Sequence, residues 1–370
     1  MFQKKNFVFS ILLIIGLLTA CGQQNDTESI VESDSTEEEA AVTDEMKEKF
    51  GENCISEQTF EVELSEYGGK VYFVPFAPEK ETQEFCMQII QNDKVLAKID
   101  AYVPDELEGE KFTSLDEVGF WDVNYDGYTD IVLIETYGDT SFAAVYYGFA
   151  ADAEDYDRNF FSQYDLSENI SNKVEQLSIS EIQKFLENGK KNGEFESFQE
   201  AYEAICRFCE LESSAERDYD LIYFDEDDIP ELVSGHNGYY MSLYTYDNGT
   251  VYTLMDWWAY GAMGNAGYEY VPRKNSLRNY NSDAGALYTT YMTINEKHSL
   301  ETVTFIETYI YEDENKNENS DGSENGYYKV SYIDGKEVSK EECESYNVGD
   351  YEDIEGKMSL EELKAKLKNQ

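Results

Sequence analysis

The sequence predicts an α+β fold that is mostly antiparallel β. Three observations support this: alternating apolar and polar runs fill residues 57–147, two amphipathic helical patterns follow, and strand patterns resume at residue 219. Apolar residues make up 41% of the 370-residue chain, which is enough for packed cores. We expect a β-rich domain over 51–175 and an α+β domain over 176–370, which begins with a two-helix connector.

The N-terminal segment has the features of an export signal. Lys4 and Lys5 precede an apolar run over 7–18 that is too short to span a membrane comfortably. The ending Leu18-Thr19-Ala20-Cys21 resembles a bacterial lipobox, which implies that residues 1–20 are removed and that Cys21 carries lipid. We expect a lipoprotein anchored to the cell membrane on its extracytoplasmic face, with an ordinary secretory signal as the alternative.

Charge dominates the segment that follows. Residues 22–45 are acidic and have almost no large apolar side chain except Ile30 and Val31, so we expect a disordered tether over 21–50. The whole chain has 28 Lys and Arg residues against 78 Asp and Glu residues, a formal net charge of −50. Such a charge repels nucleic acids and other acidic polymers, so nucleic-acid binding is not expected.

Strands are expected in both domains wherever alternation lies between turn-forming residues. Asn92-Asp93 and Asp247-Asn248-Gly249 are typical of hairpin turns, and we expect an exposed loop over 312–325. The expected strands cover 59–64, 71–76, 85–90, 95–101, 119–121, 131–136, 142–147, 219–224, 231–233, 239–246, 251–254, 286–294, 302–311 and 327–332.

Helices are expected where a capping residue precedes apolar residues at helical spacing. Ser178 with Glu181 predicts one helix start, and a stripe of apolar residues predicts a second helix over 197–211. Ser339 and Ser359, each followed three residues later by Glu, predict two late helices. The second helix contains Cys206 and Cys209 on its apolar stripe.

Five cysteines remain besides Cys21, so at least one is free or pairs between chains. Cys54 and Cys86 flank one β-rich segment and are candidates for a disulfide, and Cys343 lies near the C-terminus. Cys206 and Cys209 form a CxxC pattern inside a helix. We favour core packing or a structural bridge there, because a redox CxxC is typically found at a helix N-terminus.

One loop carries a pattern suited to calcium. The sequence from Asp122 to Asp130 reads D-x-N-x-D-G-x-x-D, and calcium prefers six to eight oxygen ligands. The expected ligands are Asp122, Asn124, Asp126, the Tyr128 carbonyl and Asp130. An EF-hand would need Glu at the position of Leu133. Leu133 instead lies in an apolar run that predicts a strand after the loop. Glu135 and Asp139 are candidates for a further ligand. The alternative is a metal-free turn.

A second acidic loop carries Asp225, Asp227 and Glu231, with Tyr223 and Asp228 at the positions of the first ligand and the turn glycine. We expect it to be structural or a weak calcium site. The first loop and the strand after it resemble the calcium loops of VCBS and FG-GAP repeats. Pro230-Glu231-Leu232 and the segment 327–342 resemble poorly characterised Firmicutes surface lipoproteins. The resemblance implies fold and location rather than one activity.

Trp257, Trp258 and Tyr260 lie among glycines and form a candidate ligand platform, against the simpler interpretation of buried packing. No catalytic constellation is evident. The leading hypothesis is a calcium-stabilised binding module with a glycan or protein ligand. The alternatives are an inhibitor or immunity-type lipoprotein acting on a cell-wall hydrolase, and a carboxylate-dependent glycan hydrolase.

Overall fold

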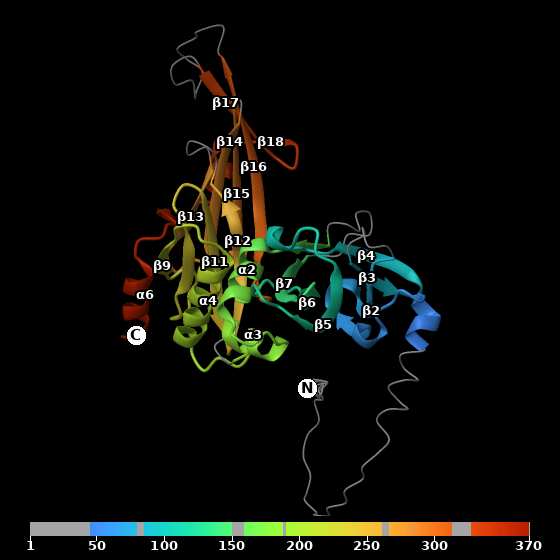
Figure 1. Ribbon diagram of the computed structural model, residues 1–370. Coiled ribbons are helices and arrows are strands. Elements are labelled where there is room, and N and C mark those ends of the chain that lie inside the picture. Colours follow the sequence, from blue (N-terminus) through green and yellow to red (C-terminus); the bar gives the residue numbers. More distant parts are fainter. Residues whose placement is uncertain are drawn as a thin grey trace, which may run out of the picture. The chain divides into compact units, whose positions relative to one another are not determined.

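The computed structural model describes residues 45–79, 85–149, 159–187, 190–260, 266–283, 285–312 and 327–369. Residues Thr43–Gln370 form one compact unit, which contains four β-sheets and several helices (Figure 1). Every pairing between described strands is antiparallel, which confirms the predicted fold class. The predicted signal segment, Cys21 and most of the predicted tether lie outside the described residues.

The first sheet has four strands in sequence order. They are β1 (Phe60–Leu64), β2 (Gly69–Phe76), β3 (Cys86–Gln91) and β4 (Lys94–Asp100). Asn92 and Asp93 join β3 to β4, and both have positive φ, as a tight hairpin turn requires. Short 3-10 helices occupy Ser56–Gln58, Ser65–Tyr67 and Asp105–Leu107.

Residues 45–50, which we had placed in the tether, are helical. Met46 and Phe50 pack against a small cluster around Cys54 and Val74 on one face of the first sheet. The Lys49 ammonium lies 3.7 Å from the centre of the Tyr72 ring. These contacts order the end of a segment whose composition alone predicts disorder.

The second sheet packs face to face on the first. Its strands are β5 (Phe112–Trp121), β6 (Asp130–Tyr137), β7 (Thr140–Gly148) and β8 (Phe160–Ser162), in that order. Ile131 and Leu133 of β6 point into the core shared with the first sheet, whereas Val132 and Ile134 point toward the helices. Burial of both faces explains why this strand is a continuous apolar run.

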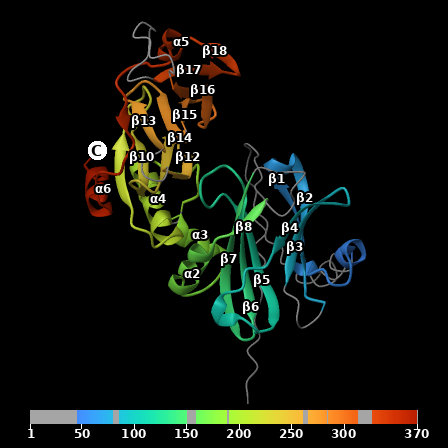
Figure 2. The same ribbon diagram turned by 90° about the horizontal axis from the view of Figure 1, so that it is seen from above.

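Helices fill the space between the second and third sheets (Figure 2). Those between the sheets are α2 (Tyr164–Lys173), α3 (Ile179–Leu186) and α4 (Phe198–Glu212); α6 (Leu360–Leu367) packs on α4 at the outer edge of the same core. Ser178 accepts a hydrogen bond from the Glu181 N–H and Ser359 forms a complete capping box with Glu362, as their spacing predicts. Cys206 and Cys209 are buried in this core, which confirms the packing interpretation.

The third sheet repeats the topology of the second. Its strands are β9 (Asp218–Ile222), β10 (Glu231–His236), β11 (Tyr240–Asp247) and β12 (Thr250–Ala259), each hydrogen-bonded to the next. One face contacts α4 and α6, and the other packs on the fourth sheet. Asn248 and Gly249 have positive φ at the predicted hairpin turn.

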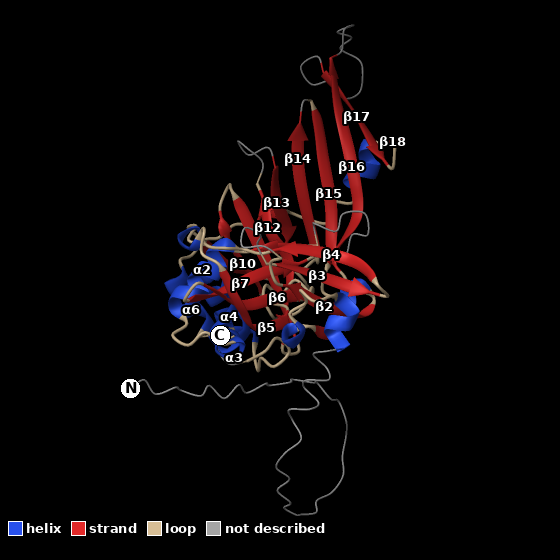
Figure 3. Cartoon of the chain, turned by 45° about the vertical axis from the view of Figure 1, so that its right-hand side comes forward, coloured by secondary structure: helices blue, strands red, loops and turns tan. Residues whose placement is uncertain are grey.

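The fourth sheet has seven strands. In spatial order they are β18 (Lys336–Val338), β17 (Tyr327–Ile333), β16 (Leu300–Glu312), β15 (Ala286–Ile294), β14 (Ser276–Asp283), β13 (Ala266–Val271) and β19 (Glu352–Asp353). The short helix α5 (Lys340–Glu344) follows β18. Figure 3 shows one end of β14 to β17 extending away from α2, α3, α4 and α6.

Several elements differ from the prediction. The helix α2 and the strands β8, β13 and β14 were not predicted. For α2 the reason is that it has no capping side chain, and for β14 that it is rich in Asn and Ser. Cys54 and Cys86 are free, so the suggested disulfide is absent from the described residues. Nearly all of the predicted loop 312–325 lies outside the described residues. In the part of the chain that the structure describes, no helix has the length and apolarity needed to cross a membrane.

Candidate functional site

A pocket of about 380 Å³ opens between the second sheet, the end of α4 and the last strand of the third sheet. Its wall combines four aromatic rings, three acidic side chains and three small or amide side chains. The lining residues are Tyr147, Phe149, Ser162, Gln163, Tyr164, Asp165, Glu212, Ser213, Asp256 and Trp257. None of them is basic. Pockets of this size, with apolar walls and a few convergent polar groups, are typical of small-molecule sites.

A bulge in β12 brings two of these residues into the pocket. Met241 pairs with Trp258 and Leu243 pairs with Met255, so Asp256 and Trp257 lie opposite Ser242 alone. Trp257 has a φ of 49°, an unusual value for a bulky side chain. Its N–H donates to the Ser242 hydroxyl, 3.0 Å away, which holds this conformation. Backbone strain of this kind is concentrated at functional sites.

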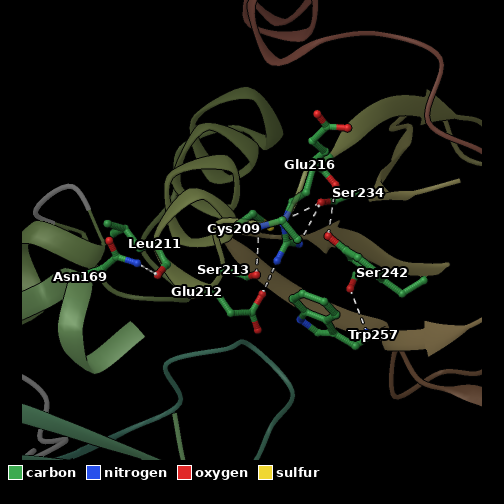
Figure 4. Close-up of polar contacts among 12 residues, drawn as sticks. Asn169, Cys209, Leu211, Glu212, Ser213, Glu216, Ser234, Ser242 and Trp257 are labelled. Carbon is green, nitrogen blue, oxygen red and sulfur yellow. Dashed lines mark hydrogen bonds and ion pairs between the residues drawn. The ribbon is translucent and has the colours of Figure 1, made fainter. Parts of the chain in front are cut away.

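Glu212, which lines the pocket, belongs to a buried ion pair (Figure 4). The Arg217 guanidinium donates to Glu212 Oε2 at 2.7 Å, and the two side chains are only 4% and 5% exposed. Arg217 also donates to the Ser234 hydroxyl and lies 4.6 Å from the centre of the Trp257 ring. The Tyr147 hydroxyl donates to Glu212 as well, at 3.4 Å. The charge of Glu212 is therefore matched within the protein.

Asp256 has no such counter-charge. The pKa of Asp256 is raised to about 7, chiefly by burial and also by the negative charges of Glu212 and Asp126, while Arg217 acts in the opposite direction. Burial also raises the pKa of Glu212, and Arg217 opposes that effect. The pocket therefore presents a carboxyl that is partly protonated near neutral pH beside one that is paired with arginine.

The predicted aromatic platform is divided between two environments. Trp257 lines the pocket and stacks on Tyr240 with ring centres 3.9 Å apart. Trp258 and Tyr260 instead pack on the core between the third and fourth sheets, where both contact Tyr268. Only Trp257 of the three can meet a ligand in this pocket.

The first acidic loop folds around its own amides. Asp122 accepts hydrogen bonds from the Asp126 and Gly127 N–H groups, both at 3.0 Å, and Asp126 accepts one from the Tyr128 N–H at 2.8 Å. Asp130 is buried, and its two oxygens accept the N–H groups of Val123 and Gly148. Asn124 donates to Asp126 at 3.0 Å. The structure thus brings together the four predicted side chains.

The second acidic loop repeats this geometry. The Asp227 N–H donates to Asp225, the Ile229 N–H donates to Asp227, and the Phe224 N–H donates to Glu231, at 3.0, 2.7 and 2.8 Å. The first loop makes the equivalent contacts at the same spacing. The two loops are therefore structural counterparts, each placed between the first and second strands of a four-stranded sheet.

The two loops differ in their counter-charge. Arg273 donates to the Asp227 carbonyl and to Asp228, and its guanidinium lies 4.5 Å from the centre of the Tyr223 ring. In the first loop, burial and, second to it, the charge of Asp126 raise the pKa of Asp122 to about 7, against the main-chain N–H groups that lower it. No basic side chain is among the groups that shift the pKa of Asp122, Asp126 or Asp130.

Further ligands for the first loop are not found where we expected them. Glu135 lies on the opposite face of β6 from Asp130, inside the core with the first sheet, and Asp139 lies at the other end of β6. Both were named as nearby candidates; the pleat of β6 excludes Glu135, and the length of β6 separates Asp139 from the loop. Among the described residues, no three His, Cys, Asp or Glu side chains are grouped so as to hold a metal ion.

Sequence reasoning missed Glu212, Arg217 and Asp256. Two of them have a weak sequence signal. Asp256 is adjacent to the predicted platform, and Glu212 is an acidic residue at a buried position of a helix. Nothing in the sequence marks Arg217. Comparison with protein-family models, curated proteins and solved structures gives no match to this chain.

Proposed function

We propose that the chain is an extracytoplasmic binding lipoprotein, anchored through lipid on Cys21, that takes a neutral saccharide unit in the pocket beside Trp257. The observation that carries this proposal is the convergence of Trp257, Asp256 and Glu212 at one pocket, built on a strained bulge. Aromatic rings stack on the C–H faces of sugars, and carboxyl and amide groups bond their hydroxyls.

The charge balance favours a neutral ligand. Glu212 is already paired with Arg217, so a cationic ligand would compete with an internal ion pair. A partly protonated Asp256 can both donate and accept, as recognition of hydroxyl groups requires. Ser162, Gln163 and Ser213 add hydroxyl and amide groups to the same wall.

The test is calorimetric titration of the purified protein with a panel of neutral oligosaccharides. We expect at least one to bind, with affinity reduced about ten-fold or more by Trp257→Ala and by Asp256→Ala. Tyr239→Ala is the control, because Tyr239 is 67% exposed and does not line the pocket. Absence of binding across the panel, or equal affinity for the wild type and Trp257→Ala, would contradict the proposal.

A glycan hydrolase is the second candidate, because Glu212 and Asp256 are two carboxyl groups in one pocket with different environments. Such pairs supply an acid and a base in glycoside hydrolysis. Turnover of a bound oligosaccharide that both Glu212→Gln and Asp256→Asn abolish would favour the hydrolase. Binding without turnover would favour the binding protein.

We also propose that calcium stabilises the first acidic loop. Asp122, Asn124, Asp126, the Tyr128 carbonyl and Asp130 supply the oxygen types that calcium prefers. The second loop supports this indirectly, because Arg273 pairs there with Asp228, whereas no described ion pair reaches Asp122, Asp126 or Asp130. Bound calcium would offset the repulsion between Asp122 and Asp126 and keep both ionised.

Thermal unfolding with and without calcium tests this. We expect calcium to raise the melting temperature of the wild type by about 5 °C at saturation. The Asp122→Ala/Asp126→Ala double variant should lose this shift. The matched control, Asp225→Ala/Asp227→Ala in the second loop, should keep it. An equal shift in both double variants, or none in the wild type, would refute the calcium site.

A further inference from the structure

One face of the fourth sheet carries an array of six aromatic rings, three of them exposed and three half-buried. We call it the aromatic face; it consists of Tyr288, Phe305, Tyr309, Tyr311, Tyr328 and Tyr332. The strand register places all six on the same side of β15, β16 and β17. It plays no part in the pocket or the acidic loops.

The rings pair with one another rather than entering a core. Tyr288 and Phe305 are nearly parallel with centres 6.0 Å apart, and Tyr311 and Tyr328 stack at 5.3 Å. Phe305, Tyr311 and Tyr328 are 43%, 42% and 41% exposed. Flat aromatic side chains on the open side of a sheet are a common feature of interaction surfaces.

The same side of the sheet is covered at one end and open at the other. Tyr268, Tyr270, Leu277 and Met292 lie on this side and pack on the third sheet. The aromatic face begins where that cover stops, along the strands that extend beyond the third sheet (Figure 3). The opposite side near β14 and β15 is contacted by Tyr351, which bonds Ser276.

Basic residues are confined to one side of these strands, whereas acidic residues occur on both, with Glu301 and Glu312 on the side opposite the aromatic face. The register puts Asp283, Glu307 and Glu337 on the side of the aromatic face. It puts Arg278, Lys329 and Lys336 on the other side. Within the described parts of β14 to β18, the aromatic face therefore has acids and rings and no basic residue.

We propose that the aromatic face docks a basic protein segment, one rich in lysine or arginine. Tyrosine and phenylalanine faces attract ammonium and guanidinium groups, and the three acids supply the matching charge. The net charge of −50 draws such a partner toward the molecule over a longer range. This surface is independent of the saccharide pocket.

The experiment compares two double variants that leave the charge of the protein unchanged. Tyr311→Ser/Tyr328→Ser removes two rings of the aromatic face. Ile310→Ser/Tyr327→Ser removes two side chains of similar exposure from the same strands on the opposite side. Fluorescence anisotropy of a labelled decalysine peptide, at about 0.15 M salt to suppress long-range attraction, measures the affinity of the full chain and each variant.

We expect the dissociation constant to rise at least about five-fold for Tyr311→Ser/Tyr328→Ser and less than about two-fold for the opposite-side variant. Glu307→Gln, which keeps every ring, should also weaken binding. Circular dichroism of each variant verifies folding. Equal affinities for the two double variants would overturn the proposal. The proposal would also be overturned if Tyr311→Ser/Tyr328→Ser left decalysine binding unchanged and instead abolished binding of neutral chitohexaose or self-association of the protein. Those results would identify a glycan or a second copy of the chain as the occupant.

Discussion

Buried carboxyl groups in this protein differ in the partners they have. Asp130 and Glu231 accept main-chain N–H groups at equivalent places in two loops, and Glu212 is paired with Arg217. Glu135 is different: it is fully buried in the core between the first and second sheets, and neither of its side-chain oxygens has a partner among the described residues. Burial raises its pKa well above the ordinary value, which favours the neutral form of the carboxyl group.

Replacing Glu135 by methionine should therefore stabilise the protein. Methionine has a similar length, and it removes a desolvated polar group that makes no hydrogen bond to offset its burial. We expect the free energy of unfolding in urea to rise by about 1 to 3 kcal/mol. Glu135→Gln, which remains polar, should give no such gain. A loss of stability in Glu135→Met would show that the Glu135 carboxyl group makes a stabilising polar contact in the core.

At the scale of single elements, similar capping patterns can have different consequences. Ser339 and Ser359 both accept the N–H of a glutamate three residues later. The helix α6 buries Leu363 and Leu367 in the central core, whereas α5 has five residues and buries none. A capping contact affects global stability only when the helix itself unfolds with the core.

Ser359→Ala should thus lower the free energy of unfolding by about 1 kcal/mol. Ser339→Ala should change it by less than about 0.5 kcal/mol, because α5 can fray without exposing apolar surface. Urea unfolding followed by circular dichroism measures both. Equal losses in the two variants would mean that α5 is coupled to the core more tightly than its burial indicates.

Prediction from sequence succeeded where local chemistry determines structure. Capping serines, hairpin turns at Asn92-Asp93 and the alternating strands all form as expected. It failed for β14, which is polar along its length and becomes a strand because neighbours on both sides supply hydrogen-bond partners. Long-range pairing of this kind leaves little trace in a single sequence.

The pocket could not be predicted from the sequence for the same reason. Trp257 stood out in the sequence, but the bulge that separates it from Trp258 depends on pairing with β11. Arg217 and Glu212 become an ion pair only when the end of α4 is packed against β10 and β12. The loop from Asp122 to Asp130 was easier to predict, because its hydrogen bonds are nearly all local.

On the scale of the whole molecule, acidic residues are both abundant and partly buried. Four carboxyl groups share a pKa raised toward neutrality, chiefly by burial. Asp122, Glu187 and Asp256 have values of about 7, and Glu231 of about 8. Each binds a proton more tightly in the folded than in the unfolded chain. Their contribution to stability is therefore complete below the ordinary carboxyl range and is lost as the pH rises through 7 to 8.

The unfolding free energy should therefore fall as the pH rises from 5.5 to 8, by at least about 2 kcal/mol. Repulsion among the surface carboxylates, which grows with ionisation, acts in the same direction. Urea unfolding at constant ionic strength, with EDTA to exclude calcium, measures the profile. Asp256→Asn removes one titrating group, so its profile should be shallower by up to about 1.4 kcal/mol per pH unit below pH 7. A flat or rising wild-type profile would show that these carboxyl groups are ionised in the folded protein. Each would then have to be stabilised by a positive charge or by water.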